Sequence, residues 1–96
     1  MNSNYHEEQE LPDETRRQYL NAKCKALILT VVGYDCQLNL AHASDTFSAD
    51  QKAAYDETRR WIKAMISHCR ELKANPKEPE NWPEASQVVR SLVEDF

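Results

Sequence analysis

Residues 26–40, ALILTVVGYDCQLNL, constrain the fold of this chain most, because they predict a helix with apolar side chains on two opposite sides. One stripe collects Leu20, Cys24, Leu27, Val31, Tyr34, Leu38 and Ala41. The other collects Ala22, Leu29, Val32, Cys36, Leu40 and Ala43. A surface helix is normally apolar on one side only, so this helix requires cover on both sides.

The helix that contains this stretch is predicted to span residues 12–43. Proline suits the first position of a helix, and Pro12 is followed by Asp13 and Glu14, whose carboxylates favour the positive end of the helix dipole. Gly33 costs about 1 kcal/mol relative to alanine inside a helix, and it indicates either close approach of another helix or a kink. A strand over residues 26–32 is the alternative, but no second strand is predicted to pair with it.

A second helix is predicted over residues 48–74, after a turn at residues 44–47. Ser48 and Gln51 have the spacing of a capping box, and Pro76 follows the end of the helical pattern. A single apolar stripe marks the buried side: Ala54, Tyr55, Thr58, Trp61, Ile62, Met65, Cys69 and Leu72. Because the connection is short, the two long helices are expected to be antiparallel neighbours.

A proline-rich linker over residues 75–82 and a short helix over residues 83–96 complete the chain, with Asn81 and Glu84 predicted as the capping box of that helix. Residues 1–11 are predicted to be an acidic N-terminal tail, and the 96 residues a single helical domain. The sequence has one glycine and no hairpin-turn pattern. The predicted fold class is therefore all-α, a long antiparallel helical hairpin plus a short C-terminal helix.

The short C-terminal helix is less than half as long as the first helix and is not expected to cover its second stripe completely. Exposed apolar stripes usually mark interfaces, so the chain is predicted to assemble into an oligomeric helical bundle, a homodimer or higher. The candidate interface residues are Leu29, Val32, Cys36, Leu40 and Trp82. A monomer in which the short helix and the tail supply all the cover is the alternative.

Basic residues gather where the start of the first helix is expected to lie beside the end of the second. The candidate anion-binding residues are Arg16, Arg17, Lys23, Lys25, Lys52, Arg59, Lys63, Arg70 and Lys73. Such a cluster fits a phosphorylated small molecule, a nucleic-acid backbone or an acidic protein surface. The alternative is an ordinary solvated face, and the net charge of −4 gives no general preference for nucleic acid.

Catalytic, metal and membrane signals are weak. Cys24, His68 and Cys69 are expected to be neighbours, but their spacing matches no zinc motif and a fourth ligand is missing, so no metal and no cofactor are predicted. Neither a glycine-rich phosphate loop nor a nucleophile elbow is present, which argues against an enzyme. No apolar run approaches the ~20 residues of a membrane span, and three widely spaced cysteines suit reduced thiols in the cytoplasm.

The predicted function is that of a small acidic non-enzymatic binding protein, acting as a regulator, adaptor or inhibitor of a partner protein. Phage and mobile-element accessory factors are one class with this combination of size, charge and helix content. The alternative is an oligomer that captures a nucleotide or a nucleic-acid backbone through the basic residues of the first two helices.

Overall fold

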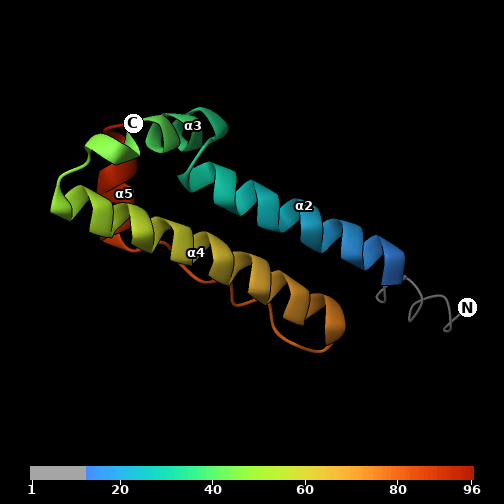
Figure 1. Cartoon of the computed structure of the whole chain (residues 1–96). Coiled ribbons are helices and arrows are strands. Elements are labelled where there is room, and N and C mark those ends of the chain that lie inside the picture. The colour runs from blue at the N-terminus through green and yellow to red at the C-terminus, as the bar shows by residue number, and fades with distance from the viewer. Residues whose placement is uncertain (1–12) are drawn as a thin grey trace, which may run out of the picture.

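The computed structural model describes residues 13–96, and within that range it contains helices and no strand (Figure 1). The elements are α2 (Asp13–Val31), α3 (Tyr34–Ala43), the 3-10 turn η1 (Ser44–Thr46), α4 (Ala49–Ala74) and α5 (Gln87–Glu94). The all-α fold class is therefore confirmed. The predicted tail of residues 1–11 and the predicted helix start at Pro12 lie outside the described residues.

The predicted single helix over residues 12–43 is wrong, because the chain leaves the helical path between Val31 and Tyr34. The amide of Val32 still donates to the carbonyl of Ile28 at 2.8 Å, and the carbonyl of Gly33 already accepts from the amide of Gln37 at 2.9 Å. Gly33 is the N-cap of α3 and has extended backbone angles, φ −64° and ψ 166°. Of the two explanations offered for this glycine, a change of helix direction is the one observed.

This break exchanges the roles of the two apolar stripes beyond Gly33. The first stripe supplies buried residues in α2, Leu20 and Cys24, but its continuation in α3 is solvent-exposed, with Tyr34 at 61% and Leu38 at 58%. From the second stripe, Val32 (0% exposed) and Leu40 (1% exposed) are core residues of the single chain. The prediction that Val32 and Leu40 form an oligomer interface is therefore wrong, because the redirected α3 buries both of them within one chain.

Helix α4 runs beside α2 in the opposite direction and supplies the other half of the core (Figure 1). The predicted capping box is present: the Ser48 hydroxyl accepts from the Gln51 amide, and the Gln51 side chain accepts from the Ser48 amide. Contacts along the pair tie the helices together, since the Cys69 thiol donates to the carbonyl of Leu20. The buried residues of α4 follow its predicted stripe: Ala54, Thr58, Trp61, Met65, Cys69 and Leu72.

Helices α3 and α5 meet at the far end of this pair. The Cys36 thiol donates to the carbonyl of Val93 at 3.8 Å, and the Asn39 amide group donates to the carbonyl of Phe96 at 3.1 Å. The ring of Phe47 contacts those of Tyr55 and Phe96 edge to face, with centroids 5.6 and 5.4 Å apart. These contacts hold the C-terminal helix over α3 and the first half of α4.

The short C-terminal helix begins later than predicted, at Gln87, and its N-cap is Ser86 rather than Asn81. Residues 81–86 are not helical; the Pro83 carbonyl lies 3.1 Å from the indole nitrogen of Trp61, and Ala85 is buried. The Ser86 hydroxyl accepts from the Val89 amide and also contacts the Glu57 carboxylate. Packing of the linker on α4 therefore overrides the predicted Asn81/Glu84 capping box.

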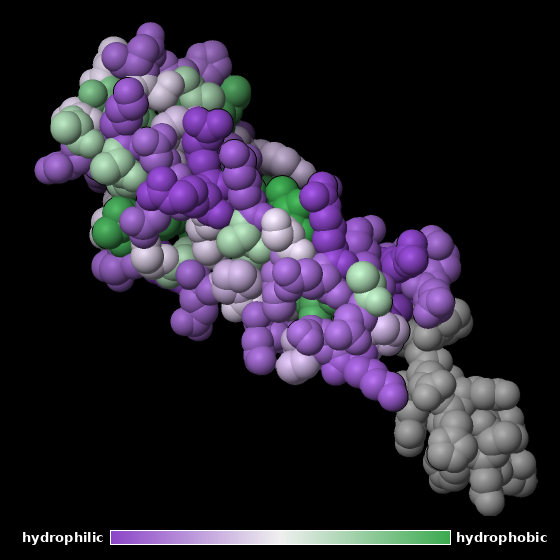
Figure 2. Space-filling model, turned by 60° about the horizontal axis from the view of Figure 1, so that its bottom comes forward, coloured by the Kyte–Doolittle hydropathy of each residue, from purple (hydrophilic) through white to green (hydrophobic). Residues whose placement is uncertain are grey.

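The resulting molecule is elongated, 62 × 21 × 18 Å. On the face drawn in Figure 2, hydrophilic residues dominate and hydrophobic residues reach the surface only in small separate areas. None of the helices within residues 13–96 has the length and apolar composition needed to cross a bilayer.

Candidate functional site

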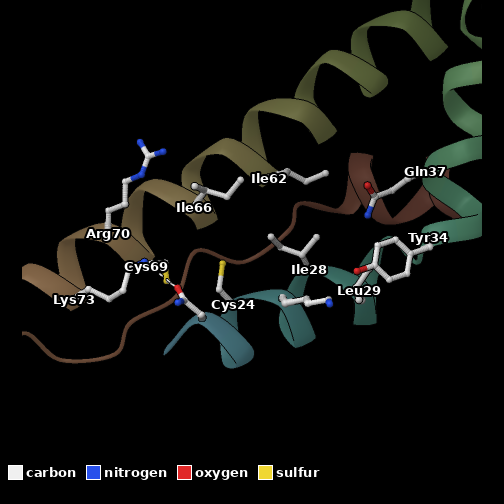
Figure 3. Close-up of a pocket in the computed structure, with 12 residues that line it drawn as sticks. Cys24, Ile28, Leu29, Tyr34, Gln37, Ile62, Ile66, Cys69, Arg70 and Lys73 are labelled. Carbon is white, nitrogen blue, oxygen red and sulfur yellow. Dashed lines mark hydrogen bonds between the residues drawn. The ribbon is translucent and has the colours of Figure 1, made fainter. Parts of the chain in front are cut away.

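A groove of about 450 Å³ lies between α2 and α4 (Figure 3). Its lining comes from both long helices and from the first turns of α3. The lining residues are Asn21, Cys24, Lys25, Ile28, Leu29, Tyr34, Gln37, Ile62, Ile66, Cys69, Arg70 and Lys73. We call this surface the α2/α4 groove.

The floor of the α2/α4 groove is apolar. Cys24, Ile28 and Cys69 are buried at its base, where α2 packs on α4. Leu29 and Ile62 are half-buried, and Ile66 is 42% exposed although it is a large aliphatic side chain. The floor therefore offers aliphatic surface that neither α3 nor α5 covers.

The linker lies on the opposite face of the helix pair, where a second hollow of about 430 Å³ remains between the linker and the two helices. Figure 3 shows the linker passing behind α2 and α4 as seen from the groove. Trp61 donates to the Pro83 carbonyl, Tyr19 donates to Glu80 at 3.2 Å, and the ring of Trp82 lies edge to face on that of His68 at 5.2 Å. The linker thus covers α2 and α4 from behind, and the α2/α4 groove is the face of the pair left uncovered.

One end of the groove is basic. Arg70 and Lys73 lie there, whereas Tyr34 and Gln37 lie at the other end (Figure 3). Arg17 lines a hollow that continues from the basic end and that also contains Arg70 and Lys73. The α2/α4 groove has three cationic side chains in its lining and no carboxylate. One carboxylate, that of Glu14, lines the adjoining hollow.

These cations are not neutralised by neighbours in the described structure. Within residues 13–96 the one contact of this kind joins His68 and Glu71 at 4.0 Å, is an ion pair only when His68 is protonated, and involves none of them. Lys73 donates to the side-chain oxygen of Asn21 at 2.8 Å, and Lys25 lies over the ring of Tyr34 at 5.8 Å. Both contacts orient an ammonium group without removing its charge, so the rim presents positive charge to whatever enters.

The structure divides the nine predicted anion-binding residues among several places. Arg17, Arg70 and Lys73 gather at or beside the basic end of the groove, whereas the Lys25 ammonium lies toward the other end, 5.8 Å from the centroid of the Tyr34 ring. Lys23 lies on the linker side, 5.9 Å from the ring of Tyr19. Lys52, Arg59 and Lys63 are exposed on α4 outside the groove lining.

Arg16 has a structural role instead. Its guanidinium donates to the backbone carbonyls of Leu72, Lys73 and Asn75 at the end of α4. The last carbonyls of a helix have no partner within the helix, so an arginine from α2 satisfies them and joins the two helices. Arg16 is thereby withdrawn from the predicted anion site.

The predicted interface residues are also separated by the fold. Leu29 is part of the groove floor. Val32 and Leu40 are buried in the core, and Cys36 is half-buried against α5. Trp82 is half-buried on the linker side, where its indole donates to Glu80 at 3.1 Å. These five residues do not form one surface.

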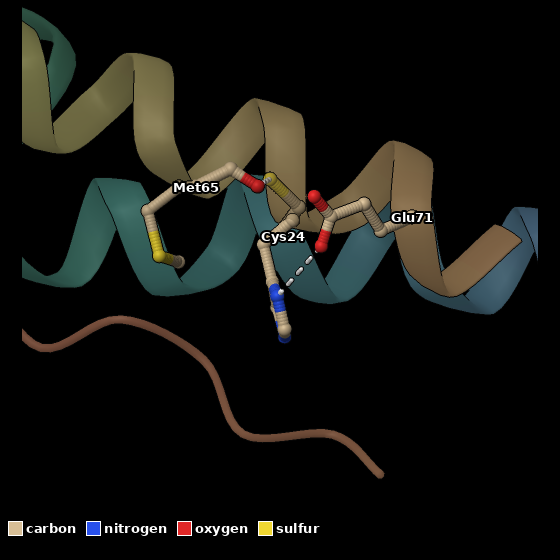
Figure 4. Close-up of polar contacts among 4 residues, drawn as sticks. Cys24, Met65 and Glu71 are labelled. Carbon is tan, nitrogen blue, oxygen red and sulfur yellow. Dashed lines mark hydrogen bonds and ion pairs between the residues drawn. The ribbon is translucent and has the colours of Figure 1, made fainter. Parts of the chain in front are cut away.

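The thiols of Cys24 and Cys69 lie near each other where the two helices pack. The Cys24 thiol donates to the Met65 carbonyl at 3.7 Å (Figure 4). On the same stretch of α4, the Glu71 carboxylate contacts His68 and not a cysteine. Burial and the neighbouring Cys69 thiol raise the pKa of Cys24 above its ordinary value of 9.0. His68 faces Trp82 on the linker side, and no group of three metal-binding side chains occurs within residues 13–96.

The α2/α4 groove was missed at the sequence level because periodicity identifies the buried side of each helix separately. Ile66 is a large aliphatic residue on α4 that falls outside the predicted apolar stripe, and four residues on lies Arg70. Single exposed aliphatic residues are common on helices, so this position does not identify the groove from the sequence.

Comparison with known protein families, curated proteins and solved structures finds no match for this chain. Function is therefore inferred from the site alone. An apolar floor with a cationic end is suited to recognition, since it can bury aliphatic groups and pair with carboxylates or phosphates.

Proposed function

We propose that this protein is a non-enzymatic binding module, a regulator, adaptor or inhibitor, that recognises a different protein through the α2/α4 groove. The observation that carries the proposal is the exposed aliphatic floor of Leu29, Ile62 and Ile66 beside a cationic rim. Apolar surface that the chain does not cover for itself commonly marks an interaction site.

The proposed interaction surface is the α2/α4 groove, whereas the predicted self-association was based on the second apolar stripe. With Val32 and Leu40 buried inside the chain, the second stripe no longer supports a homodimer. A second copy placed groove to groove would add no carboxylate to oppose the cations, because the groove lining contains none. A partner with a different surface suits this groove better than a second copy does.

Site-specific photocrosslinking tests the proposal. A photoreactive residue replaces Ile66 in the full chain, in the cells that make the protein, and a matched variant carries it at Val88, which is 49% exposed on α5 and outside the groove. We expect a covalent adduct with another polypeptide from position 66 and none from position 88. The partner identified in that adduct should then bind Ile66→Asp at least tenfold more weakly than Val88→Asp, a loss of about 1.4 kcal/mol.

Two results would contradict the proposal. One is the absence of any adduct specific to position 66. The other is an adduct whose mass is a multiple of 11.2 kDa, because it would identify a second copy as the occupant.

A further inference from the structure

We infer that the α2/α4 groove binds an amphipathic helix whose acidic residues are placed toward Arg70 and Lys73. The inference rests on the proposed function and adds the class of partner segment. Three features of the groove lead to it: the kind of walls, the length of the floor and the distribution of charge.

The walls of the groove are two helices, whose backbone groups are already paired within each helix. A strand binds another protein mainly by adding to an open sheet edge, and residues 13–96 contain no strand. Binding here must therefore come from side chains. A helix laid between two antiparallel helices presents residues at i, i+3, i+4 and i+7 to such a floor.

The floor has the length of a short helix. From Asn21 to Leu29 on α2 the groove advances eight residues, which is ~12 Å at 1.5 Å per residue. Tyr34 extends the lining beyond the end of α2. A partner helix of about three turns, roughly 16 Å long, would match this floor and bring two or three aliphatic residues onto Ile28, Ile62 and Ile66.

The charge of the groove determines which polar residues the partner helix carries beside its apolar stripe. Lys25, Arg70 and Lys73 line the groove without a carboxylate among them, and Arg17 continues the basic end into the adjoining hollow. The other end carries Tyr34 and Gln37, and a single cation, Lys25, lies over the Tyr34 ring. An acidic group at the end of the partner helix that meets Arg70 and Lys73 would pair with these two cations, whereas a basic group there would be repelled by both of them.

Synthetic helical peptides of about 16 residues, of which about 11 form the three turns that match the floor, test this inference by fluorescence anisotropy. All share one leucine stripe, and the polar positions at one end are Glu in the first peptide, Gln in the second and Lys in the third. We expect the Glu peptide to bind the full chain at least tenfold more tightly than the other two, with a preference that weakens at high salt.

Matched variants locate the site. Ile66→Asp and Arg70→Glu should each weaken the Glu peptide at least tenfold, while Val88→Asp and Arg60→Glu, which alter exposed residues outside the groove, should change it less than twofold. Arg70→Glu should also improve binding of the Lys peptide. Circular dichroism of each variant verifies that the helices are intact.

The possible failures are distinct. If the three peptides bind equally and Ile66→Asp weakens them all, the acidic helix is excluded while the proposed groove function stands. If crosslinking at position 66 finds no partner, the proposed function itself fails. A tenfold gain in affinity for the Glu peptide in an E7Q/E8Q/E10Q variant would overturn the inference by identifying the chain's own acidic segment as the occupant.

Discussion

Gly33 offers the sharpest test of the fold, because its replacement distinguishes a broken helix from a continuous one. In the structure Gly33 is the N-cap of α3 and makes no side-chain cap hydrogen bond. Its backbone angles, φ −64° and ψ 166°, match those of Ser48, the N-cap of α4, at −64° and 169°. A Cβ added at Gly33 would meet nothing nearer than the Leu29 carbonyl oxygen at 3.8 Å, an ordinary contact. Gly33→Ser therefore fits without strain and adds a hydroxyl that can accept from the Cys36 amide.

The expected gain has two parts. A serine N-cap is better than glycine by a few tenths of a kcal/mol, and removing the backbone freedom of glycine from the unfolded chain contributes about 0.4–1 kcal/mol. Gly33→Ser should thus stabilise the protein by about 0.5–1.5 kcal/mol. Gly33→Ala receives the same entropic gain but is a poor N-cap, at a cost of about 1 kcal/mol relative to serine, so its net effect should be close to zero.

Alanine should not straighten the helix either. Continuing the helix through residue 33 would gain about 1 kcal/mol from the substitution. It would remove Val32 and Leu40 from the core, where they are 0% and 1% exposed, and each loss costs about 1.5–3 kcal/mol. The free energy lost by exposing Val32 and Leu40 exceeds the helix-propensity gain from alanine, so the break at Gly33 should persist in Gly33→Ala.

Urea denaturation of the wild type, Gly33→Ser and Gly33→Ala measures the order directly. We expect Gly33→Ser to be the most stable protein and Gly33→Ala to be close to the wild type. In thermal unfolding, each kcal/mol of added stability should raise the Tm by about 4–8 °C. In a continuous helix the order would be reversed, because alanine would exceed glycine by about 1 kcal/mol and serine would lie between them. Alanine as the most stable variant, with a stronger helical signal at 222 nm, would refute the break at Gly33.

Two further predictions concern the core. Leu40→Ala should cost about 2–5 kcal/mol because Leu40 is buried, whereas Leu38→Ala, at 58% exposure, should change stability by less than about 0.5 kcal/mol in the same urea titration; equal losses would contradict the orientation of α3. Because burial raises the pKa of the Cys24 thiol above 9.0 in the folded state, the unfolded chain ionises first as the pH rises. Stability should therefore fall as the pH is raised through about 9, and less steeply in Cys24→Ala; equal slopes would show that this thiol contributes nothing.

Helix α4 was predictable because its local and tertiary signals agree. Ser48 and Gln51 form a capping box, Pro76 follows its end, and one apolar stripe meets α2. Local signals failed at α5 for a physical reason. The Asn81/Glu84 pair predicts a helix start, but a non-helical segment here buries Ala85 and brings the Pro83 carbonyl to Trp61. The tertiary contacts outweigh a helix-start preference of about 1 kcal/mol.

The break after α2 can be inferred from the four-residue spacing of the core residues, although not from the two apolar stripes considered separately. The half-buried or buried residues Leu20, Cys24, Ile28, Val32, Cys36 and Leu40 follow one another at intervals of four. In a straight helix each such step drifts by about 40°, so Leu40 would lie almost opposite Leu20. When this row of core residues is projected onto one straight helix, its first members fall on one side and its last members on the opposite side, which gives two apolar stripes. A change of direction at Gly33 lets the whole row face one core.

The same reasoning explains why the sequence predicted a basic end but not the groove. The basic end follows from the antiparallel order of α2 and α4, which brings Arg17 near Arg70 and Lys73. The groove depends on which face of the helix pair the linker covers, and that is decided by contacts far apart in the chain, such as Tyr19 with Glu80 and Trp61 with Pro83. Had the linker crossed the other face, Ile66 would be buried and Leu27 exposed. The candidate site is thus a property of the linker's path as much as of the helices that form its walls.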